Sequence, residues 1–248
     1  MTGCRLSSLG KDFTLDGRSI HALNGIDLTI EKGEFVSIVG YSGCGKSTLL
    51  KTIIGLMQPD NGKLEFHGMN GRTSIVFQEP RLISSKSVEK NMLLALKHQK
   101  NPAAKTGILD EVLEILGLTA FRNALPWQLS GGMAQRVALG RALCRQPELL
   151  LMDEPFGALD AFNRSRLQSE LVQIYLRRSI TILFVTHDIS EAVLLGKRVV
   201  IMADGGILRD IPVPLPYPRD KTSREFISVQ NEVLDTLVYQ GSPHTQYV

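Results

Sequence analysis

The chain has 248 residues, of which 43% are hydrophobic and 21% charged, and its net charge is +3. This length and apolar content favour one large globular domain, or a core that carries an inserted subdomain. No stretch approaches the roughly 20 consecutive apolar residues that span a bilayer, so a membrane role would act through a partner. Lysines and arginines form no run interleaved with aromatic residues, which argues against nucleic acid as a partner.

The cysteines and the N-terminus favour a reducing compartment. Cys4, Cys44 and Cys144 are scattered, with no CxxC pair and no zinc spacing, which is typical of free thiols. Residues 1–10 contain no charged segment followed by an apolar one, so we expect no signal peptide.

The first third of the chain predicts alternating strand and helix. Residues 34–39 are typical of a buried strand, and a glycine-rich turn and a helix over about residues 45–56 follow it. Residues 74–77 predict another short strand. Residues 87–129 then change character and are predicted to be helical, because four apolar side chains share one helix face. These are Leu109, Val112, Leu113 and Leu116.

Strand and helix alternate again in the last part. We expect strands over 149–152, 181–185 and 198–202, and helices over 162–177 and 189–195. Such alternation indicates an α/β fold with a mostly parallel sheet covered by helices. The predicted organisation is a nucleotide-binding core (1–86 and 130–210), a helical subdomain (87–129) and a C-terminal tail (211–248).

One glycine-rich segment has the spacing of a phosphate-binding loop. Gly40-Tyr41-Ser42-Gly43-Cys44-Gly45-Lys46-Ser47 matches GxxxxGK[ST], with Thr48 next, between a predicted strand and a predicted helix. Glycines let the backbone turn its N–H groups toward phosphate oxygens, and the helix N-terminus adds positive charge. We expect Lys46 to reach the β- and γ-phosphates of ATP and the Ser47 hydroxyl to bind Mg²⁺. The alternative is a chance glycine-rich turn.

Two carboxylates end the predicted strand 149–152. Asp153 would lie at the carboxyl edge of the sheet, where it suits Mg²⁺, and Glu154 is placed to act as a general base on the attacking water. Acidic pairs at strand ends also serve as helix caps. The phosphate loop in the same chain favours the functional interpretation.

Two further segments suggest contacts to phosphate. Ser130-Gly131-Gly132 precedes a helical run; the serine could simply be an N-cap, or the turn could bind an anion. Because Lys46 already serves one γ-phosphate, a second anion site makes most sense facing the nucleotide of another subunit. His187 follows the predicted strand 181–185 and could contact a γ-phosphate, although a lone histidine is more often without such a role.

Taken together, these motifs resemble the nucleotide-binding domain of ABC transporters over nearly the whole chain. The matching segments are the phosphate loop, Gln78 in Val76-Phe77-Gln78-Glu79, Leu129 to Met133, the strand ending in Asp153 and Glu154, Gly157-Ala158-Leu159-Asp160, and His187. The resemblance implies a P-loop NTPase core with a mostly parallel sheet, a small antiparallel β-subdomain and an inserted helical subdomain.

The resemblance also implies roles for single residues. Each ATP would lie between the phosphate loop of one subunit and Ser130-Gly131-Gly132 of the other in a head-to-tail homodimer. Gln78 would touch Mg²⁺ and the attacking water, and Asp160 would link the two sites. Phe13 is the best match for the adenine-stacking aromatic, with plain core packing as its alternative. Met133 stands where many members carry Gln.

Leu129 to Met133 is called the signature below. The stretch 129–139 that contains it, the proline-rich stretch 211–219 and the short tail are similar to those of importers of nitrate, taurine and aliphatic sulfonates. The resemblance therefore implies permease partners in the membrane, a periplasmic or lipoprotein solute-binding protein reached indirectly, and a peripheral place on the cytoplasmic face. Two alternatives are a soluble ABC ATPase acting on a macromolecular assembly and a nucleotide-gated scaffold with little turnover. An intact Glu154 argues against the scaffold.

Overall fold

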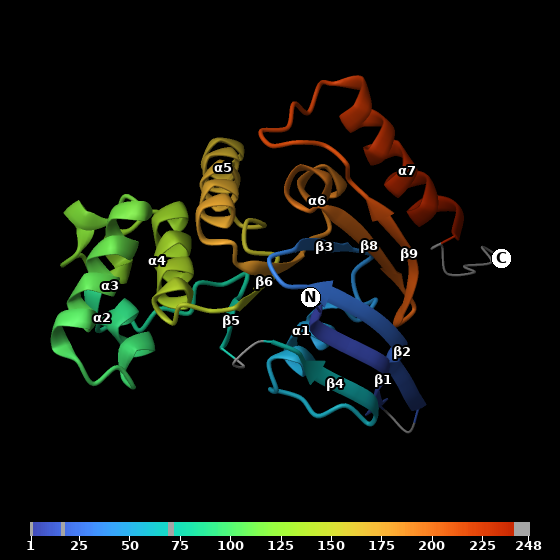
Figure 1. Cartoon of the computed structure of the whole chain (residues 1–248), viewed down its shortest axis with the longest axis horizontal. Coiled ribbons are helices and arrows are strands. Elements are labelled where there is room, and N and C mark those ends of the chain that lie inside the picture. Colours follow the sequence, from blue (N-terminus) through green and yellow to red (C-terminus); the bar gives the residue numbers. More distant parts are fainter. Residues whose placement is uncertain (1, 16–17, 69–71, 241–248) are drawn as a thin grey trace. The chain divides into compact units, whose positions relative to one another are not determined.

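The computed structural model describes residues 2–15, 18–68 and 72–240 (Figure 1). The chain divides into two compact units. Unit 1 contains residues 1–70 and 181–248, and unit 2 contains residues 71–180. The helical segment 87–129 thus shares a unit with residues 130–180, which the sequence analysis placed in the core.

Unit 1 holds two groups of strands. The strands β1 (Thr2–Leu15), β2 (Arg18–Glu31) and β4 (Asn61–Phe66) form an antiparallel sheet in the order β2-β1-β4. In the second group β3 (Phe35–Val39) lies between β7 (Thr181–Val185) and β8 (Arg198–Ala203), parallel to both, and β9 (Gly206–Pro212) pairs antiparallel with β8. Every residue of β3 and β7 is buried, as expected for strands covered on both faces.

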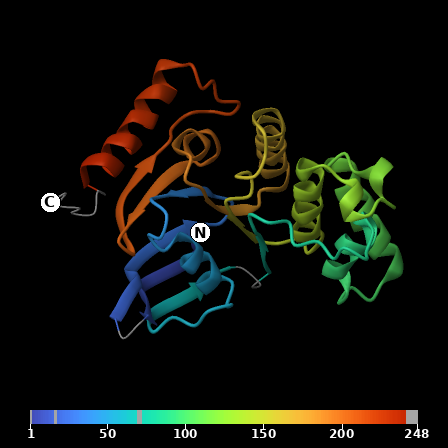
Figure 2. The same ribbon diagram turned by 180° about the vertical axis from the view of Figure 1, so that it is seen from behind.

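The helices of unit 1 are α1 (Lys46–Ile53), α6 (Ile189–Leu195) and α7 (Arg224–Gln240). Figure 2 shows α7 running along β9, and it packs against α6, β8 and β9. Phe226, Val233 and Leu237 of α7 join Val39, Val199 and Ile201 in one buried cluster. Residues 211–240 are therefore folded onto the core, although the sequence analysis assigned them no element. Residues 241–248 of the expected tail lie outside the described residues.

Unit 2 combines two parallel strands with helices. The strands β5 (Thr73–Val76) and β6 (Leu149–Asp153) pair with Val76 beside Met152. The helices are α2 (Val88–Leu93), α3 (Pro102–Ile115), α4 (Gly131–Cys144) and α5 (Ala161–Arg178), with short 3₁₀ turns at Leu94–Leu96, Thr119–Phe121 and Pro126–Gln128. In Figure 1 and Figure 2, α2, α3 and α4 gather into a bundle.

The predicted elements agree with the structure in kind and differ at their ends. The predicted face of α3 is confirmed, since Leu109, Val112, Leu113 and the adjoining Leu116 are all buried. The helix predicted over about residues 45–56 begins within one residue of the expected start, but it ends earlier than predicted. Gly45 has a left-handed φ of 104°, so the helix begins at Lys46, and it ends at Ile53, shortly before Gly55 turns with φ 79°.

Among the described residues, none of the helices combines the length and the apolar character needed to cross a bilayer. The α/β class, with mostly parallel strands and a small antiparallel sheet, is as predicted.

Candidate functional site

The predicted phosphate loop lies in unit 1, between the last residue of β3 and the first turn of α1. Gly43 and Gly45 have φ values of 84° and 104°, which a residue with a Cβ adopts only with strain. A Cβ on Gly45 would overlap the carbonyl oxygen of Ala22 in β2. The close passage of β2 therefore requires glycine here, and the positive φ curls the loop ahead of the helix.

Gly40 and Cys44 pack against one another at the base of the loop. A Cβ on Gly40 would overlap the Met202 carbonyl and lie 2.6 Å from the sulfur of Cys44. Burial raises the pKa of the Cys44 thiol, although the neighbouring Lys46 ammonium acts in the opposite direction. The thiol therefore stays protonated at neutral pH and fills the loop as a small apolar group.

The Lys46 ammonium lies inside the loop. Only 6% of Lys46 is exposed, and its Nζ donates to the carbonyl oxygens of Gly40 (2.7 Å) and Tyr41 (2.9 Å). Among the described residues it forms no ion pair with a carboxylate. Its third partner is the sulfur of Cys44 at 3.8 Å. A nearly buried cation held by neutral groups attracts an anion strongly, because little solvent screens it.

Tyr41 connects the loop to the C-terminal helix. Its hydroxyl donates to the carbonyl oxygen of Leu237 at 2.9 Å. Leu237 lies in the last turn of α7, where the backbone carbonyl groups have no hydrogen-bond donor within the helix. The loop motif predicts Tyr41 only as part of the phosphate loop and gives no sign of this contact.

Phe13 lies on the β1–β2 hairpin, opposite Ile20. It is 37% exposed, and the Lys11 ammonium lies 5.8 Å from the centre of its ring. Ala22 of the same hairpin contacts the loop at Gly45, so Phe13 is carried on a strand pair that reaches the phosphate loop. Its partial exposure argues against plain core packing, while stacking on adenine stays a prediction.

His187 follows β7 on a turn with fixed geometry. The hydroxyl of Thr186 donates to the buried carboxylate of Glu191 at 2.5 Å and accepts from the backbone N–H of Asp188. Asp188 caps α6 by accepting from the N–H of Glu191. These bonds set the backbone on both sides of His187, whose side chain is exposed.

The residues predicted to act on water lie in unit 2, after the carboxyl ends of β5 and β6. Val76 of β5 pairs with Met152 of β6, and the two strands are parallel. Gln78, which follows β5, therefore lies at the same edge of the strands as Asp153 and Glu154 at the end of β6. A Cβ on Gly157 would be 3.3 Å from the side-chain nitrogen of Gln78, so the Gln78 amide lies against the turn that follows Glu154. The structure brings these two predicted segments together.

Glu154 has a strained backbone. Its φ is 44°, a left-handed value that is unusual for a residue with a Cβ, and Pro155 follows it. The carbonyl oxygen of Glu154 accepts from the N–H of Gly157 at 3.2 Å, which closes the turn. Such strain is found preferentially at functional sites, where it can be part of the mechanism.

Ser130 and Asp160 each cap a helix, and the side chain of Asn163 lies close to both capping segments. The Ser130 hydroxyl accepts from the N–H of Met133 at the start of α4, so the N-cap interpretation is confirmed and leaves the anion role open. Asp160 caps α5, and hydrogen bonds from Asn163 and Phe162 lower its pKa. A Cβ on Gly132 would be 3.3 Å from the Asn163 side chain. The signature and the segment 157–160 thus meet at Asn163, which the sequence analysis missed.

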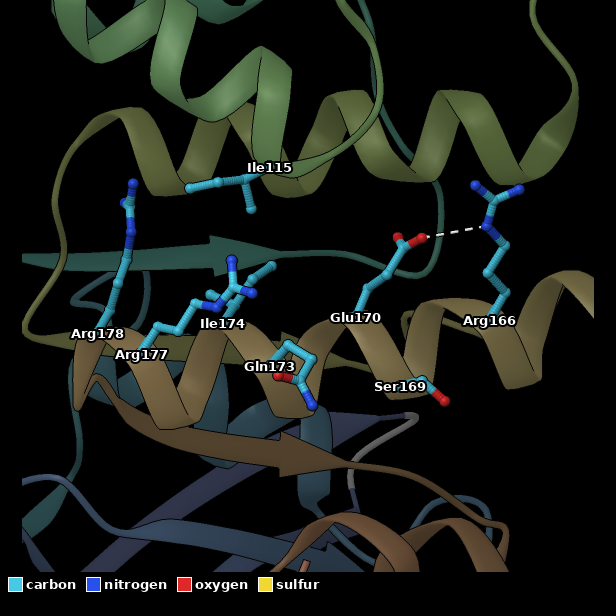
Figure 3. A pocket seen from close by; sticks show the side chains of 8 residues that line it. All are labelled: Ile115, Arg166, Ser169, Glu170, Gln173, Ile174, Arg177 and Arg178. Atoms are coloured by element: carbon cyan, nitrogen blue, oxygen red, sulfur yellow. Dashed lines mark hydrogen bonds and ion pairs between the residues drawn. The ribbon is translucent and has the colours of Figure 1, made fainter. Parts of the chain in front are cut away.

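Unit 2 also has a pocket that contains none of the predicted residues. It has a volume of about 450 Å³ and lies between the end of α3 and one face of α5 (Figure 3). Its charged lining includes Arg166, Glu170, Arg177 and Arg178, and the Arg166–Glu170 pair is 3.2 Å long. The Glu170 carboxylate also forms an ion pair with Arg136 of α4, with 2.8 Å between Oε1 and Nη2. This side of α5 therefore helps to hold α4 in place.

Comparison with known families agrees with this geometry. Residues 23–157 match the family model described as ABC transporter, a segment that runs from β2 through the phosphate loop to the turn after Glu154. The chain belongs to the ABC transporter family. The predictions of an ABC ATPase and of a P-loop fold are therefore confirmed.

Individual ABC proteins are similar along nearly the full chain. The aliphatic sulfonates import ATP-binding protein SsuB of Bacillus subtilis (strain 168) is 44% identical over 231 residues, or 90% of each chain. The solved dimer of the ATP-binding cassette MJ0796, in a post-hydrolysis state bound to ADP and Pi, is 31% identical with a TM-score of 0.76, covering 86% of this chain and 100% of that one. The structure of cbiO1 from Clostridium perfringens, part of the ABC transporter complex cbiONQ, is 26% identical with a TM-score of 0.78, covering 96% and 95%.

Proposed function

We propose that the chain is the ATP-hydrolysing subunit of an ABC importer that takes up a small anionic or zwitterionic solute. The observation that carries the ATP assignment is the Lys46 ammonium, nearly buried inside a loop of glycines and held by two carbonyl oxygens. The importer assignment is supported by the relative SsuB, whose name refers to import of aliphatic sulfonates. Nitrate, taurine and aliphatic sulfonates are the candidate solutes.

ATP would bind with its phosphates in the loop of residues 40–48. The loop N–H groups and the N-terminus of α1 would donate hydrogen bonds to the phosphate oxygens, and Lys46 would hold the β- and γ-phosphates. Phe13 would stack on the adenine. Ser47, Gln78 and Asp153 offer the oxygen ligands that Mg²⁺ prefers and would hold it, where it neutralises charge on the phosphates.

Hydrolysis would proceed by attack of water on the γ-phosphorus. Glu154 would accept a proton from the water while the bond between the γ-phosphorus and the β–γ bridging oxygen breaks, giving ADP and phosphate. Gln78 would orient the water, and His187 would contact the γ-phosphate. The strained backbone at Glu154 supports this assignment, because such strain is found preferentially at functional sites.

Two copies would share each nucleotide. Ser130-Gly131-Gly132 of one copy would face the ATP bound by the other, and Asp160 would connect the two sites. Their common neighbour Asn163 supports this pairing, because a shift at one segment reaches the other through a single side chain. Permease subunits would contact the loop after Gln78 from the membrane, with the chain on the cytoplasmic face, and a solute-binding protein would deliver the solute outside.

The proposal can be tested by uptake. Radiolabelled taurine, nitrate and ethanesulfonate are offered to cells that carry the chain with its neighbouring permease, and to cells in which the chain carries Lys46→Ala. We expect uptake of one of these solutes to require Lys46. The importer assignment would be refuted by two results together. Lys46→Ala would leave the uptake of all three solutes unchanged, and the chain would co-purify with a soluble assembly that contains no multi-span membrane protein.

A further inference from the structure

The loop that follows Gln78 is held by one arginine from the signature helix. Residues 79–87 form no helix or strand, yet Arg141 of α4 donates from Nη1 to the Arg81 carbonyl and from Nη2 to the Pro80 carbonyl, both at 2.9 Å. Arg81 has a φ of 48°, and its guanidinium lies 4.1 Å from the centre of the Phe77 ring. The planar fork of Arg141 thus fixes two consecutive carbonyl groups in an otherwise irregular segment.

A second side chain of α4 holds the same segment on the other side of Gln78. Gln135 is 3% exposed, and its Nε2 donates to the carbonyl oxygen of Phe77 at 3.1 Å. The backbone carbonyls before and after Gln78 are therefore bound to one helix. The amide nitrogen of the Gln78 side chain itself lies close to Gly157.

The far end of the loop is held by α2. Asn91 is fully buried; its Oδ1 accepts from the N–H of Ile83 at 2.8 Å, and its Nδ2 donates to the carbonyl oxygens of Ile83, Lys86 and Ser87. A buried amide that serves four backbone groups leaves this end little freedom. Asn91, Gln135 and Arg141 therefore hold the loop from both ends.

The same helix begins at the signature. Ser130 caps α4, and Arg141 lies eleven residues further on, about 16 Å along the axis. Arg136 connects α4 to α3 through the Leu116 carbonyl at 2.9 Å, and to α5 through Glu170. A helix fastened in this way transmits a displacement along its length without bending.

We propose that Arg141 is a positioning residue that makes the loop 79–87 one rigid body with the signature helix, with Gln135 and Asn91 completing the attachment. A push on the loop from a permease then moves Ser130 directly, instead of passing first through β5. This inference rests on the proposed function, because it assumes a permease that contacts the loop.

The test uses the complete transporter in liposomes and the purified chain. Arg141→Met keeps the apolar stem and removes the fork, and Arg141→Lys keeps the charge with one ammonium. Arg145→Met is the matched control, because Arg145 lies at the end of the same helix and is exposed. For each variant, kcat and KM for ATP are measured with the isolated chain, and then the stimulation of ATP hydrolysis by the loaded solute-binding protein.

We expect the kcat of isolated Arg141→Met to stay within about twofold of the wild-type value. In the complete transporter, the stimulation of its ATP hydrolysis by the loaded solute-binding protein should be at least fivefold smaller than in the wild type. Arg141→Lys should recover part of it, and Arg145→Met should match the wild type. Hydrogen exchange of the amides over 79–87 should be at least tenfold faster in Arg141→Met. Equal stimulation of Arg141→Met and wild type, or unchanged exchange, would overturn the inference. A wild-type transporter that shows no stimulation would instead count against the proposed function.

Discussion

At the scale of single residues, Glu154 combines a predicted chemical role with an observed strain. Its backbone φ of 44° is costly for a side chain with a Cβ, and the Gly157 N–H secures the turn. Since the strain belongs to the backbone, an isosteric change of the side chain should leave the turn intact. That makes the carboxylate testable without loss of fold.

Glu154→Gln should bind ATP normally and lose turnover by about 10²–10⁴-fold, because the water loses its base while the phosphate loop is unchanged. Phosphate release measures turnover, and fluorescent ATP titration measures binding. Lys46→Ala provides the contrast, since it should weaken the binding itself. Turnover of Glu154→Gln within a few-fold of wild type would contradict the assignment.

Tyr41 offers a second test at this scale. Tyr41→Phe removes only the hydroxyl that bonds to Leu237, so we expect the free energy of unfolding to fall by about 0.5–1.5 kcal/mol. Urea unfolding followed by circular dichroism measures the change. If stability is unchanged, the bond contributes nothing beyond what water offers the two groups.

At the scale of elements, α7 is part of the core of unit 1. Its buried face inserts Phe226 and Val233 among residues of β8 and α6, while Ile227 and Leu234 are about 43% exposed on another face. A helix bound through one apolar face derives most of its stability from that packing.

Phe226→Ala should therefore lower the free energy of unfolding by about 3–5 kcal/mol, because the side chain is fully buried and leaves a cavity. The matched control is Ile227→Ala, which removes a partly exposed side chain next to it and should cost under about 1 kcal/mol. Similar losses for the two variants would show that α7 is not bound through its Phe226 face.

At the scale of the whole molecule, the proposed site is completed by a second copy. If the γ-phosphate bridges the two copies, Glu154→Gln should sediment as a dimer in ATP and as a monomer in ADP, because binding to the closed state favours assembly. Sedimentation velocity in both nucleotides measures this. A mass that does not depend on the nucleotide would contradict the shared site.

The sequence by itself determined the parts whose geometry is local. The phosphate loop needs only neighbouring residues, because its glycines set the turn and the following helix supplies the charge. The strand 181–185 and the helix 189–195 were predicted with the observed bounds, since a buried apolar run and a capping aspartate fix them within a few residues.

The tertiary structure decided the contacts between residues far apart in the chain. Gln135 reaches the Phe77 carbonyl across 58 residues, and Tyr41 reaches Leu237 across 196. The sequence showed Gln135 and Arg141 only as polar residues in a helical run, because no spacing rule says which carbonyl a side chain will meet. Likewise, the apolar residues of 211–240 did not predict where α7 packs. Which face of the helix is buried depends on the strands that the fold places beside it. Local sequence motifs were enough to predict the residues for ATP binding and hydrolysis. The contacts that join the signature helix to the loop 79–87 depend on long-range packing and appeared only in the tertiary structure.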